Sequence, residues 1–192
     1  MGYFANAAQI LIDFAFGIAI FLFVLRALLQ VVRANFYNPI CQFLYKITNP
    51  LLMPLRKLIP GWRNIDFAAW LIAWLLSVLK LALIYTIFGQ HLGLLGLLLM
   101  ALADLADFVL VLYIGIVLVR VLLSFISVER SNPVVPLIHQ LSEPFMRPLR
   151  KRLPTPGGLD FSPMIVILVI LLMRALLVAP LIDLGMRLAQ AA

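Results

Sequence analysis

The sequence predicts an all-α integral membrane protein in which four transmembrane helices form two tandem, parallel helix-loop-helix repeats. Three observations support this prediction: a very apolar composition, four apolar segments of membrane-spanning length, and a motif that occurs twice. Hydrophobic residues make up 65% of the 192 residues and charged residues 12%, against roughly 45–50% and 25% in soluble domains. So few charges cannot cover the surface of a soluble domain, which excludes a soluble enzyme, a disordered chain and a disulfide scaffold.

Four segments contain the roughly 20 apolar residues that a helix needs to cross the hydrocarbon core. They are residues 10–32, 67–88, 108–128 and 163–184. A shorter apolar stretch, 92–103, either extends the third helix or lies at the interface. No Lys or Arg precedes Arg26 and no small-residue cleavage site closes the first apolar run, so we expect that segment to remain as an anchor and not to be a cleaved signal peptide.

The second half of the chain repeats the first at a constant offset of 94 residues. Prolines and charges coincide as well as leucines, so apolar bias alone does not explain the match. The chain thus forms one membrane domain made of two repeats. The first repeat covers residues 1–94, with a loop at 34–66 between its two spans. The second covers residues 95–192, with a loop at 129–162. Because each repeat has two spans, both enter the membrane in the same direction. The repeat motif comprises Asn38, Pro39, Pro50, Pro54, Pro60 and Asp66, then Asn132, Pro133, Pro144, Pro148, Pro154 and Asp160, with Gly157, Gly158, Ser162 and Pro163 in the second copy.

The distribution of charge predicts the orientation. Ten of the 15 basic residues lie in the two loops, whereas Arg187 lies on the opposite side. The positive-inside rule therefore places both loops in the cytoplasm and both termini outside.

Both loops show apolar residues at helical spacing, which predicts amphipathic helices lying in the membrane interface. The Asn-Pro pairs at 38–39 and 132–133 suit an N-cap followed by proline at the first helical position. We expect a second short helix to begin at Pro50 and at Pro144, and to stop before the prolines at 60 and 154. Ser162 and Asp66 are the expected caps of the spans that follow the loops.

The basic residues of the loops are candidates for binding anionic lipid headgroups or an unidentified protein partner, each contributing roughly 1 kcal/mol near an anionic surface. The alternative is that the loops only anchor and orient the bundle. A homo-oligomer is a further partner that the sequence allows; nucleic acid is not expected, because the basic stretches lack regular aromatic interleaving. The candidates are Arg56, Lys57, Arg147, Arg150, Lys151 and Arg152.

Charges within the apolar spans are costly and therefore functional candidates. We expect Arg26 either to extend its side chain toward the cytoplasmic edge or to meet Asp66, and Arg120 and Asp160 to repeat this pattern. Asp13 and Lys80 are placed to pair, as are Asp107 and Arg174. Such pairs either fix the helix register, form a polar path across the bundle, or face a partner. The candidates are Asp13, Arg26, Lys80, Asp107, Arg120 and Arg174.

No enzyme constellation, metal site or cofactor is expected. Cys41 is the only cysteine, and His91 and His139 fall on opposite sides of the membrane in this topology. The chain also lacks HExxH and GxSxG motifs.

The motifs at 54–57 and 148–151, both Pro-Leu-Arg-Lys, and the run Gly-Gly-Leu-Asp-Phe-Ser-Pro at 157–163 resemble the YggT family over nearly the whole chain. The first repeat departs from this run at 62–64 and 68–69. The resemblance implies a small bacterial inner-membrane protein, with relatives in cyanobacteria and plastids. It also implies associations with osmotic or extracytoplasmic stress, potassium uptake, cytochrome assembly and nucleoid or division organisation, and no established catalytic residue.

The leading functional hypothesis is therefore a non-enzymatic scaffold or assembly factor in envelope or osmotic-stress homeostasis, acting through the basic cytoplasmic loops. The alternative is an ion channel or transporter component that uses the intramembrane charge pairs.

Overall fold

The computed structural model describes residues 2–90, 92–125, 132–152 and 160–190, and within these ranges its regular structure is helical. Four helices are long and apolar enough to cross a membrane: α1 (Gly2–Val31), α3 (Phe67–Ile87), α4 (Leu94–Phe125) and the continuous stretch Ser162–Gln190. The last consists of α6 (Ser162–Met173), the π-helical segment η2 (Arg174–Val178) and α7 (Ala179–Gln190). The four predicted spans are confirmed, and most of the apolar stretch 92–103 belongs to α4.

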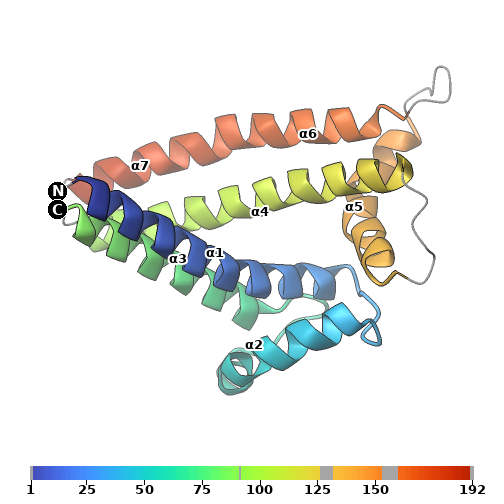
Figure 1. Ribbon diagram of the computed structural model, residues 1–192, viewed down its shortest axis with the longest axis horizontal. Coiled ribbons are helices and arrows are strands. Elements are labelled where there is room, and N and C mark those ends of the chain that lie inside the picture. Colours follow the sequence, from blue (N-terminus) through green and yellow to red (C-terminus); the bar gives the residue numbers. More distant parts are fainter. Residues whose placement is uncertain (1, 91, 126–131, 153–159, 191–192) are drawn as a thin grey trace.

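The bundle is built from two helix pairs. Figure 1 shows α1 beside α3 and α4 beside α6–α7, and the packing of α3 against α4 joins the pairs. Both termini lie at one end, which we call the terminal end. The connecting helices α2 (Pro39–Leu58) and α5 (Val134–Arg150) lie toward the opposite end, which we call the loop end.

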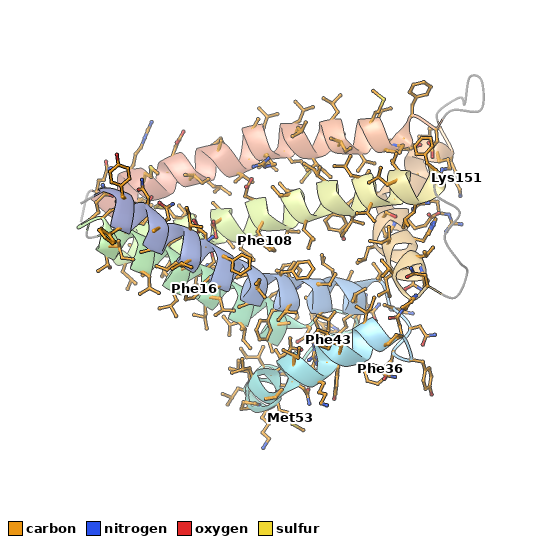
Figure 2. All side chains as sticks on the ribbon, in the orientation of Figure 1. Phe16, Phe36, Phe43, Met53, Phe108 and Lys151 are labelled. Atoms are coloured by element: carbon orange, nitrogen blue, oxygen red, sulfur yellow. The ribbon has the colours of Figure 1, made fainter. Side chains whose placement is uncertain are left out.

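Small residues let the paired helices approach closely. Ala68, Ala69 and Ala73 of α3 are fully buried. A Cβ atom added to Gly96 of α4 would lie 2.3 Å from the backbone nitrogen of Ala189 in α7, so only glycine fits there. Large apolar side chains project outward around the bundle instead (Figure 2), as expected for helices whose solvent is lipid.

The two connecting helices differ from the prediction of paired short helices. α2 runs unbroken through Pro50 and Pro54, and α5 runs through Pro144 and Pro148. Figure 1 shows the last turns of α2 turning away from its first turns, as proline causes a helix to bend. Thr48 and Ser142, two residues before Pro50 and Pro144, lie inside the continuous helices and bond back to carbonyls of their own helix, as described below.

The helix starts follow local capping chemistry with two differences. Asn38 caps α2 by accepting from the Ile40 nitrogen at 2.9 Å, and Asp66 caps α3 by accepting from the Ala69 nitrogen at 3.2 Å, both as predicted. Ahead of α5, Asn132 accepts from the Val134 nitrogen at 2.9 Å, but Pro133 precedes the helix instead of opening it.

The start of α6 is also shifted. Ser162 is the first residue of the helix and Pro163 follows it, so the predicted capping role of Ser162 is wrong. Asp160 takes that role, because its carboxylate accepts from the Ser162 nitrogen at 2.9 Å. Pro154, Gly157 and Gly158 lie outside the described residues.

The fourth span contains one irregular turn. In η2 the Ala179 nitrogen donates to the Arg174 carbonyl five residues earlier. Pro180 follows, and in a regular helix its ring would press on the carbonyl of Leu176. The wider π turn gives that carbonyl room.

Candidate functional site

A buried arginine ties each connecting helix to the span before it. Arg26 of α1 is 7% exposed and donates to the Thr48 hydroxyl of α2, and to the Tyr45 carbonyl at 3.4 Å. The Thr48 hydroxyl in turn donates to the Leu44 carbonyl at 2.6 Å. Thr48 thus lies inside α2, where its hydroxyl bonds to its own helix and accepts from the arginine.

The second half of the chain shows the same arrangement 94 residues later. Arg120 of α4, also 7% exposed, donates to the Ser142 hydroxyl at 2.6 Å, and Ser142 donates to the Ile138 carbonyl at 2.6 Å. Arg120 pairs with Glu143 at 2.9 Å and not with Asp160, which corrects the prediction. The reason is that α5 packs directly on α4 and brings Glu143 to the arginine. The hydrogen bond from Arg120, outweighing burial, holds the pKa of Glu143 below its ordinary value.

Asp66 is the centre of a buried charge cluster. It is 1% exposed, pairs with Arg56, and lies 3.9 Å from the Arg26 guanidinium. Arg56 also donates to Gln30 at 3.4 Å. The expected meeting of Arg26 and Asp66 is confirmed, and the cluster links α1, α2 and α3.

Asp160 occupies the matching position in the second half, at the surface. It pairs with Arg150 at 2.7 Å, with side chains 33% and 41% exposed respectively. Burial would raise the pKa of Asp160, but hydrogen bonds from Ser162 and Arg150 outweigh it and hold that pKa below its ordinary value. Arg56 and Arg150 are thus engaged within the chain.

The other basic candidates are exposed. No carboxylate of the described residues lies within 4.0 Å of Lys57, Arg147, Lys151 or Arg152. Figure 2 shows Lys151 at the loop end. The six predicted lipid- or partner-binding residues therefore divide into two that hold the fold together and four whose charges face outward.

A cavity of about 470 Å³ opens at the loop end of the first half, between α1, α2 and residues 61–66. Its wall carries four guanidinium groups and one carboxylate, together with apolar and aromatic side chains. The charged residues are Arg26, Arg33, Arg56, Arg63 and Asp66. A second cavity, of about 680 Å³, lies between the end of α1 and α5 and includes Glu143, Arg147 and Lys151.

Two ion pairs link α4 to its neighbours nearer the terminal end. Asp107 pairs with Arg174 at 2.6 Å, as predicted. Lys80 pairs with Asp104 at 2.7 Å and not with Asp13, which corrects the prediction. Asp13 is on the exposed side of α1, whereas α3 packs against α4 and so brings Lys80 to Asp104.

Sequence reasoning overlooked several partners. Asp104 also accepts from the Ser77 hydroxyl. Asp104 was overlooked because it falls between the stretch 92–103 and the predicted span 108–128, which the structure joins in α4. Thr48 and Ser142 carried one usable signal: both bear hydroxyls at matching positions of the repeat. Among the described residues, no three His, Cys, Asp or Glu side chains are grouped in a way that could hold a metal ion.

Comparison with known proteins gives one family. The model of the CCB3/YggT family matches residues 5–87 and again residues 99–181, so the two matches start 94 residues apart. An uncharacterized protein of Pseudomonas aeruginosa is 37% identical over 176 residues, 90% of this chain and 89% of the relative. An uncharacterized protein of Vibrio alginolyticus is 40% identical over 164 residues, covering 82% and 85%. The uncharacterized protein YggT of Escherichia coli K12 is 37% identical over 148 residues, 76% of each chain. No solved structure is a significant match.

Proposed function

The chain belongs to the CCB3/YggT family, and from this premise we propose that it is a non-enzymatic scaffold or assembly factor of the bacterial inner membrane. It acts through its loop end, which the positive-inside rule assigns to the cytoplasm. The two tandem repeats place their connecting helices together at this end. The role lies in envelope or osmotic-stress homeostasis.

One observation carries the proposal. Lys57, Arg147, Lys151 and Arg152 are exposed on or next to the two connecting helices, and no described carboxylate lies within 4.0 Å of any of them. At roughly 1 kcal/mol each, four such charges contribute about 4 kcal/mol toward an anionic surface, or about a thousand-fold in affinity. They suit anionic headgroups and an acidic surface of a partner protein.

The intramembrane charges support a structural role within this scaffold. Lys80, Asp104, Asp107 and Arg174 are all engaged in ion pairs between helices. Ion pairs of this kind determine which faces of neighbouring helices pack together. In both pairs the carboxylate is balanced by a positive charge. The alternative of a transport component stays a prediction, and its test is given in the Discussion.

The experiment reverses the four outward charges together to Glu in a strain that lacks the chromosomal copy. Arg56 and Arg150 are left intact, because reversing them would break the pairs with Asp66 and Asp160. We expect the variant to reach the membrane at the wild-type level and to lose complementation after an osmotic upshift. Arg187→Glu, at the terminal end, is the control and should complement. Full complementation by the fourfold variant would refute the proposal.

A further inference from the structure

The cavity of the first half concentrates positive charge that its own carboxylate does not balance. Four arginines face one aspartate, which gives the wall a formal charge of +3. Arg26 and Arg56 share Asp66. Arg33 and Arg63 are exposed, and no described carboxylate lies within 4.0 Å of either. The two unpaired guanidinium groups are therefore available to a ligand.

The backbone under these two arginines is in a conformation that favours glycine. Arg33 has φ of 54° and Arg63 has φ of 53°. Arg33 ends α1 as the left-handed residue of a Schellman motif, with Ala34 donating to the Leu29 carbonyl at 2.9 Å. Arg63 is the first central residue of the tight turn that the mutual bonds of Trp62 and Ile65 close. Both positions are ones that glycine fills at no steric cost.

The second half of the chain indicates what the arginine side chains are for. Ninety-four residues after Arg33 and Arg63 the sequence has Ser127 and Gly157. The repeat therefore does not need a cation at either position, and at the second it has the residue that the turn prefers. Strained residues that persist in a fold cluster at sites where a side chain is used. Two such residues on the wall of one cavity point to a ligand.

We infer that this cavity is a binding site for a phosphate group, carried either by the headgroup of an anionic lipid or by a soluble phosphate compound. Guanidinium groups match phosphate oxygens with two parallel hydrogen bonds, which lysine does not provide. All four cations of the cavity are arginine. Its volume lies within the range of about 300–1,000 Å³ that is common for small-ligand sites.

The other half of the wall suits a ligand that is partly apolar. The Arg26 guanidinium lies 4.8 Å from the centre of the Tyr45 ring, and Phe36 packs edge-on against that ring at 5.2 Å. Leu29 and Leu44 also line the cavity. The site lies where α1 ends, so the phosphate would sit at the level of the headgroups if the ligand is a lipid.

Cys41 supplies a site-specific assay. It lines the cavity and is the only cysteine of the chain. Burial raises the pKa of its thiol, so alkylation with N-ethylmaleimide is best followed at about pH 8.5, where more thiolate is present. A ligand that fills the cavity lowers the rate by the factor 1 + [L]/Kd, about tenfold at nine times Kd.

The rate is measured on the full-length protein in phosphatidylcholine nanodiscs, in phosphatidylglycerol nanodiscs, and in phosphatidylcholine nanodiscs with inorganic phosphate at matched ionic strength. Protection by phosphatidylglycerol alone identifies a lipid headgroup, and protection by inorganic phosphate identifies a soluble source. Equal rates under all three conditions overturn the inference.

Two variants decide whether protection comes from the arginines. Arg33→Gln/Arg63→Gln should weaken binding by about tenfold or more for each arginine, and so remove the protection. Lys46→Gln/Arg187→Gln removes the same charge at two exposed positions outside both cavities and should keep the protection. Loss of protection in both double variants would show that only general charge matters, and protection kept in both would show that Arg33 and Arg63 are not needed; either result would refute the site.

Arg63→Gly separates binding from folding. It puts into the first half the residue that stands at the matching position of the second, so the unfolding temperature without ligand should not fall below the wild-type value. Protection should still be lost. Retained protection in a variant that is as stable as the wild type contradicts the inference. The assay does not use the fourfold variant of the scaffold test, so either proposal can fail alone.

Discussion

Asp66→Asn tests the buried charge cluster directly. The substitution removes one negative charge and keeps the cap of α3, because asparagine caps a helix about as well as aspartate. It leaves Arg26, 7% exposed, and Arg56, 32% exposed, without their shared counter-charge. Removing one partner of a buried pair costs about 3–5 kcal/mol. Because Arg56 is partly hydrated, we expect about 3 kcal/mol of unfolding free energy to be lost.

Asp160→Asn is the matched control at the equivalent position of the repeat. Its pair with Arg150 is 33% and 41% exposed, and exposed pairs contribute about 0.2–1 kcal/mol. The two single substitutions should therefore differ by about 2 kcal/mol. Adding Arg56→Gln to Asp66→Asn should restore part of the loss, because the pair is then removed together.

The free energies are measured by titrating the purified protein from mild detergent into sodium dodecyl sulfate and following helicity by circular dichroism. Equal losses for Asp66→Asn and Asp160→Asn would refute the reasoning. Such a result would mean that the Asp66 carboxylate is as well hydrated as that of Asp160.

Three further predictions test other parts of the bundle. Gly96→Ala should lower the unfolding free energy by about 1–3 kcal/mol, because the new Cβ would meet Ala189. Gly115→Ala, on the same helix, places its Cβ with nothing within 4 Å and should not lower the unfolding free energy. Similar losses of unfolding free energy in the two variants would contradict the close packing of α4 and α7. In proteoliposomes under a potassium gradient, neither the wild type nor Asp107→Asn should pass ions; a wild-type flux that the variant abolishes would replace the scaffold by a transport component. Burial, followed by the charge of Arg120, lowers the pKa of His139 in the folded protein. Just below pH 6.5 the unfolded state therefore binds more protons than the folded state. The unfolding free energy should fall as the pH is lowered from 7 through that window, and level off below the folded pKa. His139→Gln should flatten this part of the titration, and an unchanged slope would argue against it.

The spans and the starts of α2 and α3 were predictable because the signals that determine them are local. Apolar runs of about 20 residues become membrane-spanning helices, and Asn38 and Asp66 bond to amides two or three residues ahead. Neither feature depends on what packs against the helix.

The helix breaks and several pairings were not predictable because tertiary contacts decide them. Pro50 was expected to begin a second helix, but α2 runs through it, and Thr48 just before it accepts a hydrogen bond from Arg26 of another helix. The partner of Lys80 depends on which face of α4 meets α3, and a one-dimensional repeat does not contain that information. The repeat also did not show that Asp66 is buried while its counterpart is exposed.

The π turn of η2 determines which face of α7 packs against α4. Successive residues of an α-helix are rotated by about 100°, and a π turn holds one extra residue before the chain returns to the same face. Converting that turn to regular α-helix while keeping every residue would rotate α7 by about a quarter turn. Gly185 and Ala189, now against Met100 and Gly96, would then point toward lipid. The angular setting of the C-terminal helix is therefore encoded by a single surplus residue beside Pro180.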